Sequence, residues 1–188
     1  MQIKRGFEWR RIYSRAHRCE IEKCSWLFCH HELSLHQVIH RNGTHMKFWE
    51  QKSLSAMNDE EWESLCDGCG RCCLSKLEDA YSGTIHYTNV PCRLLDTRAC
   101  RCTDYPRRSE KVPDCVRLTP DQPESFHWLP TTCAYRRLHE GRPLPDWHPL
   151  ITGTPQSVHD AGISVRGRCA PVYDDEELEF HLIDWIKT

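Results

Sequence analysis

Hydrophobic and polar positions of this chain follow a clear period only in short stretches, and these stretches predict its first regular elements. Asn58, with a glutamate three residues later, has the form of a helix N-cap with a capping box. Trp62 and Leu65 then fall on one face of the short helix, which is predicted to end at Cys66. Residues 84–90 are rich in β-branched and aromatic side chains and follow a Ser-Gly pair, which predicts a strand.

The second half of the chain predicts two more helices and a long irregular segment. Five prolines punctuate residues 106–130, which indicates loops. Thr132 is suited to cap a helix that runs to about Glu140 and ends at Gly141. Asp174 is suited to cap a last helix, because the apolar residues after it recur on one helical face. These apolar residues are Leu178, Leu182, Trp185 and Ile186. Together the elements predict a small, loop-rich single domain of the α+β class.

The first 45 residues differ from the rest in composition. They hold eight Lys and Arg against four Asp and Glu, half of the twelve histidines and no proline, whereas the remainder holds 17 basic and 23 acidic residues. Terminal segments without docking contacts are usually poorly ordered. We therefore interpret residues 1–45 as an N-terminal extension that is disordered or not native, with Met46 as the native start. Residues 46–188 are then the cysteine-cluster domain.

Composition and charge exclude several classes of protein. Apolar residues make up 39% of the chain, with seven Trp, six Tyr and five Phe, so the chain is not disordered by composition. No stretch approaches the ~18 apolar residues that span a bilayer, and no apolar secretory signal follows the basic start, so we expect no membrane association. The net charge of −2 supplies no field that would attract nucleic acid.

Thirteen cysteines are the outlier of the composition. In a chain without a secretory signal, clustered cysteines are typical of metal or redox sites, because the cytosol keeps thiols reduced. An odd number of cysteines also fits complete pairing into disulfides badly. We therefore expect a cytoplasmic protein organised around a cysteine-ligated metal centre.

The densest part of the pattern is the string Cys66-Asp-Gly-Cys69-Gly-Arg-Cys72-Cys73. Two residues between thiolates let a tight turn bring both sulfurs to one ion. A glycine after the second cysteine allows a positive φ, so that backbone N–H groups can point at the sulfurs. Cys72 and Cys73 extend the cluster, but adjacent side chains are expected to diverge. The pair therefore indicates two centres, a polynuclear cluster, or one ligand with a spare thiol.

Five further cysteines complete a predicted set of nine metal ligands. A structural zinc takes four ligands, and iron–sulfur clusters with two or four irons also take four cysteines, so nine could fill two sites with one left over. The predicted ligands are Cys66, Cys69, Cys72, Cys73, Cys92, Cys100, Cys102, Cys115 and Cys133. Cys169 has no neighbouring cysteine in the sequence and is left out. The alternative, that several of the nine are small buried apolar residues, stays open.

Histidines and arginines near the cysteines have a structural and a functional interpretation. His148 and His159 could bind a metal, but a histidine among aromatic residues is more often a hydrogen-bonded core residue. A basic run among the cysteines is expected to offset thiolate charge, with phosphate or RNA contact as the weaker alternative. This run comprises Arg98, Arg101, Arg107 and Arg108.

Several segments carry a resemblance to a known family. They are Phe48-Trp49, residues 61–70, Cys72-Cys73, residues 88–95, Pro113-Asp114-Cys115, Trp128-Leu129-Pro130, residues 132–136, residues 147–150 and residues 163–166. On these segments the chain resembles the CxxCxxCC family of zinc- or iron-chelating domains, and nearly all of residues 46–170 is similar to its bacterial YcgN-like branch. A Cys-x2-Tyr-x2-Arg element of the wider family is matched by Cys102, Tyr105 and Arg108.

The resemblance implies a metal site but no particular biological role. Our leading expectation is a metal-binding protein that holds an iron–sulfur cluster or Zn²⁺. The excess of cysteine and the absence of a clear mixed Cys/His spacing favour iron–sulfur. The alternative is a structural zinc module that binds a partner protein or nucleic acid, although the acidic domain argues against nucleic acid. A third hypothesis is a protein-modifying enzyme, because the flagellin lysine methylase shares the cysteine string. Against it, the chain lacks the G-x-G-x-x-G fingerprint of a nucleotide cofactor.

Overall fold

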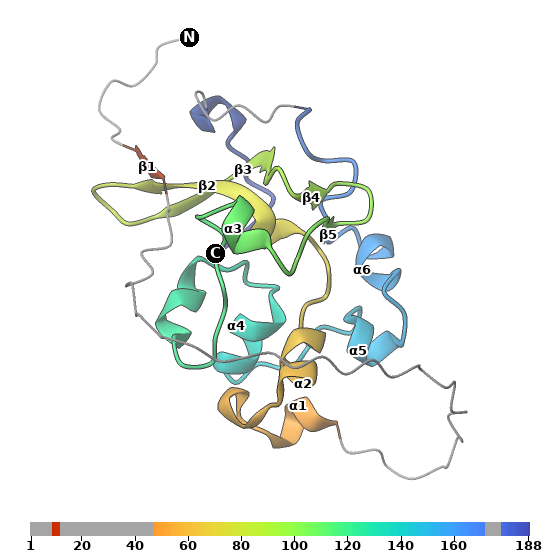
Figure 1. The fold of residues 1–188 in the computed structure, drawn as a ribbon. Coiled ribbons are helices and arrows are strands. Elements are labelled where there is room, and N and C mark those ends of the chain that lie inside the picture. Colours follow the sequence, from red (N-terminus) through yellow and green to blue (C-terminus); the bar gives the residue numbers. More distant parts are fainter. Residues whose placement is uncertain (1–8, 12–46, 172–177) are drawn as a thin grey trace.

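The computed structural model describes residues 9–11, 47–171 and 178–188, and its regular elements are short (Figure 1). The strands are β1 Trp9–Arg11, β2 Leu74–Asp79, β3 Ile85–Pro91, β4 Leu95–Asp96 and β5 Arg101–Cys102. The α-helices are α1 Phe48–Gln51, α2 Asp59–Ser64, α3 Arg108–Lys111, α4 Ala134–His139, α5 Pro149–Thr152 and α6 Ser157–Asp160. The 3-10 helices are η1 Leu54–Ala56, η2 Arg71–Cys73, η3 Pro123–Trp128 and η4 Leu178–His181.

A small antiparallel sheet is formed by β1, β2 and β3 in that order, and β4 pairs with β5 in a second, two-stranded ribbon. β3 confirms the strand predicted over residues 84–90. The turn before it is held by Asp79, whose Oδ1 accepts hydrogen bonds from the N–H groups of Tyr81 and Ser82. The register between β2 and β3 shifts between Leu74 and Lys76, so the start of β2, next to the cysteine string, is bulged.

β1 belongs to the N-terminal extension and pairs with the outer edge of β2. In this antiparallel pairing Trp9 lies opposite Asp79 and Arg11 lies opposite Leu77. Residues 1–8 and 12–46 lie outside the described residues. The interpretation of residues 1–45 as a disordered or non-native extension, and of Met46 as the start, therefore stays a prediction.

The first predicted helix is confirmed as α2. The Asn58 side chain accepts from the Glu61 N–H at 2.9 Å, and the Glu61 carboxylate accepts from the Asn58 N–H at 3.0 Å, which is the capping box. The helix predicted from Thr132 is also present as α4. Its N-cap is Cys133 rather than Thr132, and the chain leaves it through Gly141 at a φ of 68°.

The prediction of a last helix is wrong for the part of it that the structure describes. Asp174 lies outside the described residues, and after the single turn of η4 the chain forms an isolated bridge at Leu182 and bends rather than a helix. Leu182 bridges to Thr88, and the Ile183 N–H donates to the Tyr87 carbonyl at 2.9 Å. Backbone pairing with β3 and burial of Ile186 therefore outweigh the helical period of the apolar residues.

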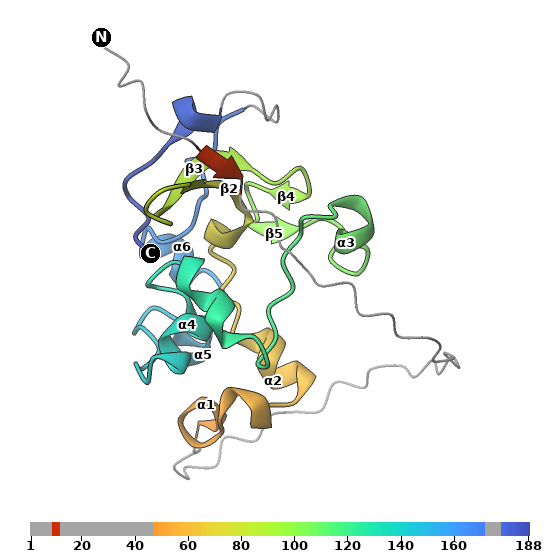
Figure 2. The ribbon, with the colours of Figure 1, turned by 90° about the vertical axis from the view of Figure 1, so that its left-hand side faces the viewer.

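Two layers make up the domain, with the sheet at one end and α1, α2, α4 and α5 at the other (Figures 1 and 2). One core cluster lies among the helices and includes Leu65, Phe126 and Leu129. A second lies under the sheet and includes Tyr87 and Val165. The Tyr87 hydroxyl joins them by donating to the Trp128 carbonyl at 2.8 Å. The cysteine string runs between the two clusters, from the end of α2 to the start of β2.

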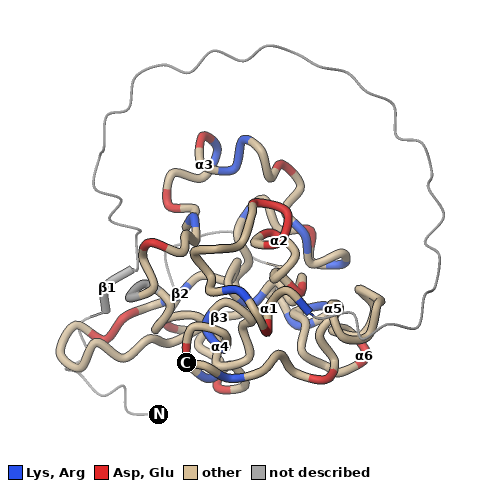
Figure 3. Tube along the Cα trace, turned by 90° about the horizontal axis from the view of Figure 1, so that it is seen from below, with Lys and Arg blue, Asp and Glu red and all other residues tan. Residues whose placement is uncertain are grey.

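Basic and acidic residues are interspersed along the described trace, including around α3 (Figure 3). Asp104, for example, pairs with both Arg107 and Lys111. Among the described residues, no helix has the length and apolar character needed to cross a bilayer. The helices and small antiparallel sheets agree with the predicted α+β class.

Candidate metal centre

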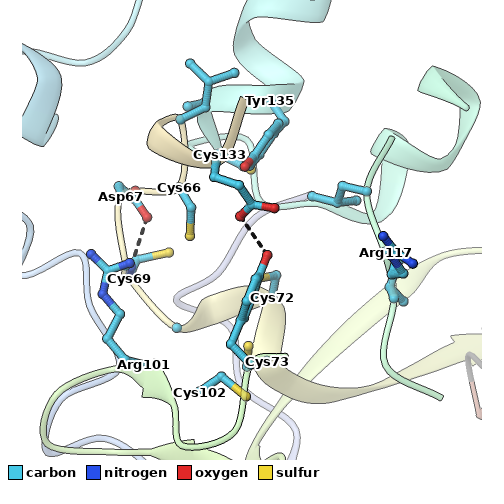
Figure 4. A pocket seen from close by; sticks show the side chains of 18 of the residues that line it. Cys66, Asp67, Cys69, Cys72, Cys73, Arg101, Cys102, Arg117, Cys133 and Tyr135 are labelled. Carbon is cyan, nitrogen blue, oxygen red and sulfur yellow. Dashed lines mark hydrogen bonds between the residues drawn. The ribbon is translucent and has the colours of Figure 1, made fainter. Parts of the chain in front are cut away.

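All nine cysteines predicted as ligands line a single cavity of about 480 Å³. They are Cys66, Cys69, Cys72, Cys73, Cys92, Cys100, Cys102, Cys115 and Cys133. In Figure 4 the labelled cysteines surround a common space from several elements: the turn after α2, the η2 helix, β5 and the start of α4. Segments separated by more than 60 residues therefore meet at one place, which the spacing of any single motif could not predict.

The turn that carries Cys66 and Cys69 is shaped by two glycines and an aspartate. Gly68 and Gly70 have φ values of 73° and 74°, a region that other residues rarely adopt. Asp67 is buried, and its Oδ1 accepts a hydrogen bond from the Cys69 N–H at 2.9 Å (Figure 4). The glycine of positive φ that was expected in the Cys-x-x-Cys turn is thus found at two positions. The hydrogen bond of Asp67 closes this turn.

Buried contacts from distant parts of the chain hold this turn in place. The Val165 N–H donates to the Cys69 carbonyl at 2.9 Å. Arg71 is also buried, and its guanidinium donates to the Ile163 carbonyl and to the Thr132 hydroxyl. The segment 163–165 therefore fixes the cysteine string from outside the cavity.

Cys72 and Cys73 lie together on η2, and both line the cavity. The expectation that these adjacent side chains diverge stays a prediction. The interaction between the two neighbouring thiols lowers the pKa of Cys72 and raises the pKa of Cys73. The Cys92 N–H donates to the Cys73 carbonyl at 2.8 Å, so the chain leaving β3 is tied to the same turn.

The Cys100-x-Cys102 pair comes from the β4–β5 ribbon. Cys100 is buried and has a φ of 54°, the one non-glycine residue with a positive φ in the described chain. Such backbone strain is typical of functional sites. Its thiol contacts the Thr97 carbonyl at 3.8 Å, whereas Cys102 lies on the strand itself. Cys133, considered in the sequence as a core residue or a ligand, lies at the N-cap of α4 and faces the cavity.

Burial controls the charge state of the thiols. It raises the pKa values of Cys69 and Cys133 well above the ordinary value. Burial also lowers the pKa of the Lys76 ammonium, which lies near the thiols of Cys72 and Cys73. In the metal-free protein, therefore, the innermost thiols hold their protons, and a metal ion must displace them.

Three arginines line the cavity wall: Arg101, Arg108 and Arg117. Arg101 and Arg108 belong to the basic run predicted to offset thiolate charge, while Arg107 pairs with Asp104 instead. Sequence analysis missed Arg117, Lys76 and the buried Asp67. The position of Asp67 inside the Cys-x-x-Cys turn was a signal that could have identified it.

Cysteine thiols are suitable metal ligands, although those of the cavity do not meet at one point. Within the described ranges, no three His, Cys, Asp or Glu side chains meet closely enough to hold one ion as they stand. Soft thiolates are the ligands preferred by zinc and by iron–sulfur clusters, so loading requires thiols to lose protons and turn inward. Cys169 is absent from the cavity lining, in keeping with its omission.

Both histidines considered as possible ligands have hydrogen-bonded rings. His148 is fully buried and is hydrogen-bonded to backbone groups on both ring nitrogens. His159 Nδ1 lies 2.8 Å from the Ser164 hydroxyl. Neither lines the cavity. The interpretation as hydrogen-bonded core residues is confirmed for His148.

A model of the CxxCxxCC family, described as "Putative zinc- or iron-chelating domain", matches residues 65–134, a range that includes all nine cavity cysteines. Among similar proteins, a UPF0260 protein of Rhodopseudomonas palustris (strain HaA2) is 57% identical over 141 residues, covering 73% of this chain and 83% of the relative. The UPF0260 protein of Allorhizobium ampelinum is 55% identical, covering 75% and 90%. That of Rhizorhabdus wittichii is 58% identical, covering 73% and 94%. The chain belongs to the UPF0260 family.

The UPF0260 assignment confirms the predicted resemblance. The range matched by the CxxCxxCC model, residues 65–134, contains the nine cysteines that line the cavity and excludes both Cys169 and the extension. No solved structure matches this UPF0260 chain. The functional proposal therefore rests on the geometry of the cavity.

Proposed function

We propose that this UPF0260 protein binds a polynuclear iron–sulfur centre in the cysteine cavity. The observation that carries the proposal is that nine cysteines line one cavity of about 480 Å³. A single water needs only ~10–15 Å³ of such space, and cavities of ~300–1,000 Å³ are typical of small-molecule and cofactor sites. A lone zinc with four thiolates would leave five cavity thiols without a role.

The setting of the cavity supports this proposal. The ten cysteines of the described chain are free thiols, the state that a reducing compartment maintains, so we place the functional protein in the cytoplasm. Arg101, Arg108 and Arg117 bring positive charge to the wall, which would stabilise the negative charge of a thiolate-bound cluster. Cysteine thiolates alone are sufficient to hold clusters of two or four irons.

A structural zinc module is the second candidate. Cys66 and Cys69, on their glycine-shaped turn, form a knuckle that zinc sites commonly use. In that case one ion would tie this turn to two other thiols, and the domain would act by binding a partner protein. Nothing in the described structure favours the protein-modifying enzyme over these two.

Anaerobic purification followed by metal and sulfide analysis, together with a visible absorption spectrum, tests the proposal. An iron–sulfur protein will be coloured and will contain iron with acid-labile sulfide. Colourless protein with stoichiometric zinc would instead support the second candidate, and protein with neither metal after anaerobic reconstitution would contradict both.

The matched variants are Cys66→Ser and Cys169→Ser. Serine at a ligand position replaces a soft thiolate by a hydroxyl that stays protonated, so Cys66→Ser is expected to lose a metal centre. Cys169 lies outside the cavity, with its thiol 3.7 Å from the Val165 carbonyl, so its substitution should leave the metal content unchanged. Equal metal content in both variants would exclude the cavity as the binding site.

A further inference from the structure

Asp67 carries a buried carboxylate oxygen that the described protein leaves without a partner. The residue is only 6% exposed and lies between Cys66 and Cys69 in the wall of the cavity. Its Oδ1 accepts from the Cys69 N–H, whereas Oδ2 is buried and has no hydrogen-bond partner among the described residues. Leaving a buried carboxylate oxygen unpaired is unfavourable, so its retention calls for a positively charged partner.

No side chain of the described protein supplies this partner. Of the ion pairs within 4.0 Å that the described residues form, none involves Asp67. The Arg71 guanidinium is engaged by Ile163 and Thr132, and it also lies 5.6 Å from the centre of the Trp185 ring. Lys76 donates to the carbonyls of Cys72 and Leu74 instead.

Arg101 is the third cation near Asp67, and it likewise forms no ion pair with the Asp67 carboxylate. Its guanidinium packs against the backbone of Gly68, so closely that a β-carbon on Gly68 would lie 2.8 Å from it. In Figure 4 it lies beside the Asp67–Cys69 turn, on the cavity wall. There it can offset thiolate charge on Cys66, whose ionisation it favours.

We propose that Asp67 Oδ2 is an oxygen ligand of the metal centre held by Cys66 and Cys69. The inference rests on the proposed function, because it requires a metal in the cavity. Carboxylate oxygens bind zinc at ~2.0–2.2 Å, close to the ~2.3 Å of a thiolate sulfur, and oxygen is a harder donor than sulfur. The turn would then supply two sulfurs and one oxygen. The metal ion bound by Cys66 and Cys69 would therefore have a carboxylate ligand in addition to its thiolates.

The competing explanation is that Asp67 only shapes the turn through Oδ1. Asp67→Asn separates the two roles, since asparagine keeps the acceptor for the Cys69 N–H but replaces the charged Oδ2 by a neutral amide. Asp79→Asn is a matched control. Asp79 is also 6% exposed and also accepts backbone N–H groups in a turn, but it lies outside the cavity.

The experiment measures Zn²⁺ affinity, by competition with a chromophoric chelator, and thermal unfolding of the stripped and the Zn²⁺-loaded full chain. Asp67→Asn is expected to weaken Zn²⁺ binding by about tenfold or more, the scale on which even residues that support metal ligands act. Its stripped form should melt at or above the wild-type temperature, because an unpaired buried charge has been removed. Asp79→Asn should lower the melting temperature of both forms and leave Zn²⁺ affinity unchanged.

A measurement on the wild-type chain covers the case in which a variant fails to fold. X-ray absorption of the Zn²⁺-loaded protein is expected to contain an oxygen shell at ~2.0–2.2 Å beside the sulfur shell. A shell of sulfur alone, or Asp67→Asn protein with wild-type affinity, would overturn the oxygen ligand while leaving the proposed function intact. Wild-type protein that takes up neither zinc nor an iron–sulfur cluster would overturn both.

Discussion

His148 Nε2 lies 3.1 Å from the carbonyl oxygen of Leu65, the residue that precedes the first cysteine of the string. The other ring nitrogen, Nδ1, accepts from the Leu150 N–H at 3.1 Å, so Nε2 must carry the proton and donate to Leu65. The neutral imidazole thus connects the end of α2 to the start of α5. His148 positions the Cys66 turn without binding a metal itself.

Acid should weaken the domain through His148. Burial lowers its pKa below the ordinary value, so the unfolded chain takes up a proton before the folded one does. The contribution of His148 to stability is therefore complete above pH ~6.5 and is lost as the pH falls below that value. Thermal unfolding between pH 8 and 5 should show a smaller acid-induced loss in His148→Gln, which cannot titrate, than in wild type.

The control for this prediction is His159→Gln. Burial also lowers the pKa of His159, but this residue is less buried than His148. Within the described residues, its ring is hydrogen-bonded only to the Ser164 hydroxyl. Its substitution should leave most of the acid dependence in place. Identical pH profiles for His148→Gln and wild type would contradict the prediction.

Gly70 should tolerate substitution less well than other glycines of positive φ. An alanine there would place Cβ 2.9 Å from Cγ2 of Val165, which is fully buried and cannot move easily. At Gly68 the nearest group is the mobile end of Arg101. Gly167→Ala is the control, because its φ of 71° imposes the same backbone strain with no atom within 4 Å.

Denaturant unfolding measures the difference. The backbone strain shared by the variants is worth about 1–2 kcal/mol, and overpacking against Val165 should add about 1–3 kcal/mol in Gly70→Ala. Equal losses in Gly70→Ala and Gly167→Ala would show that the Val165 contact is unimportant.

Metal binding should release protons and tighten as the pH rises. Burial holds the thiols of Cys69 and Cys133 protonated near neutral pH, so each one that becomes a ligand must lose its proton. Calorimetric titration with Zn²⁺ in buffers of different ionisation enthalpy should give about one proton for each such thiol. Binding that does not change between pH 6 and 8 would mean that other groups hold the metal.

The same burial predicts the pH dependence of the stripped protein. A thiol pKa that is raised on folding means that the unfolded chain loses its protons first, at pH ~8.5 and above. The free energy of unfolding of the stripped protein should therefore fall as the pH rises through that range. Loaded protein should not show this loss, because its thiols are already deprotonated.

Local signals in the sequence predicted the parts of the fold that depend on local contacts. The capping box at Asn58 and the β-branched segment that became β3 are examples. The C-terminal segment was mispredicted because its backbone pairs with β3, about 95 residues away in the chain. Its apolar period is compatible with a helix, and only the long-range pairing decides against one.

The cysteines that line the cavity could be predicted as a set from cysteine clustering, but their arrangement could not. No spacing rule connects Cys66 with Cys133, whose thiols line the same cavity. The 3-10 turn of η2, which carries both Cys72 and Cys73, was not predicted from the sequence. Asp67 lies inside the motif, yet only its burial and the unpartnered Oδ2 distinguish it from a residue that simply shapes a turn.

Cys72→Ser and Cys73→Ser should each reduce metal content, and to a similar extent. Both thiols line the same cavity, so a centre that occupies it is expected to reach both. Metal analysis of the two variants beside Cys169→Ser tests this expectation. Loss of metal in only one of the pair would mean that the other is a spare thiol.

Lys76 should support both the fold and the loaded cavity. Its ammonium donates to the carbonyls of Cys72 and Leu74 at 2.7 Å each, and it lies 5.0 Å from the centre of the Tyr87 ring and 4.9 Å from that of Trp128. Lys76→Met keeps the length of the side chain and removes its charge. Hydrogen bonds to charged groups contribute about 1.5–3 kcal/mol each, so the stripped protein should be destabilised on that scale.

The charge of Lys76 should also matter when the cavity is loaded, because a thiolate-bound metal carries negative charge that a nearby ammonium stabilises. Metal affinity in Lys76→Met is therefore expected to fall together with stability. Lys111→Met is the control: that exposed lysine pairs with Asp104 on the surface and should contribute less than about 1 kcal/mol. Denaturant unfolding and chelator competition on both variants measure the two effects separately. If Lys76→Met lowers stability but binds metal with wild-type affinity, Lys76 supports only the turn at Cys72 and does not offset the charge of the bound centre.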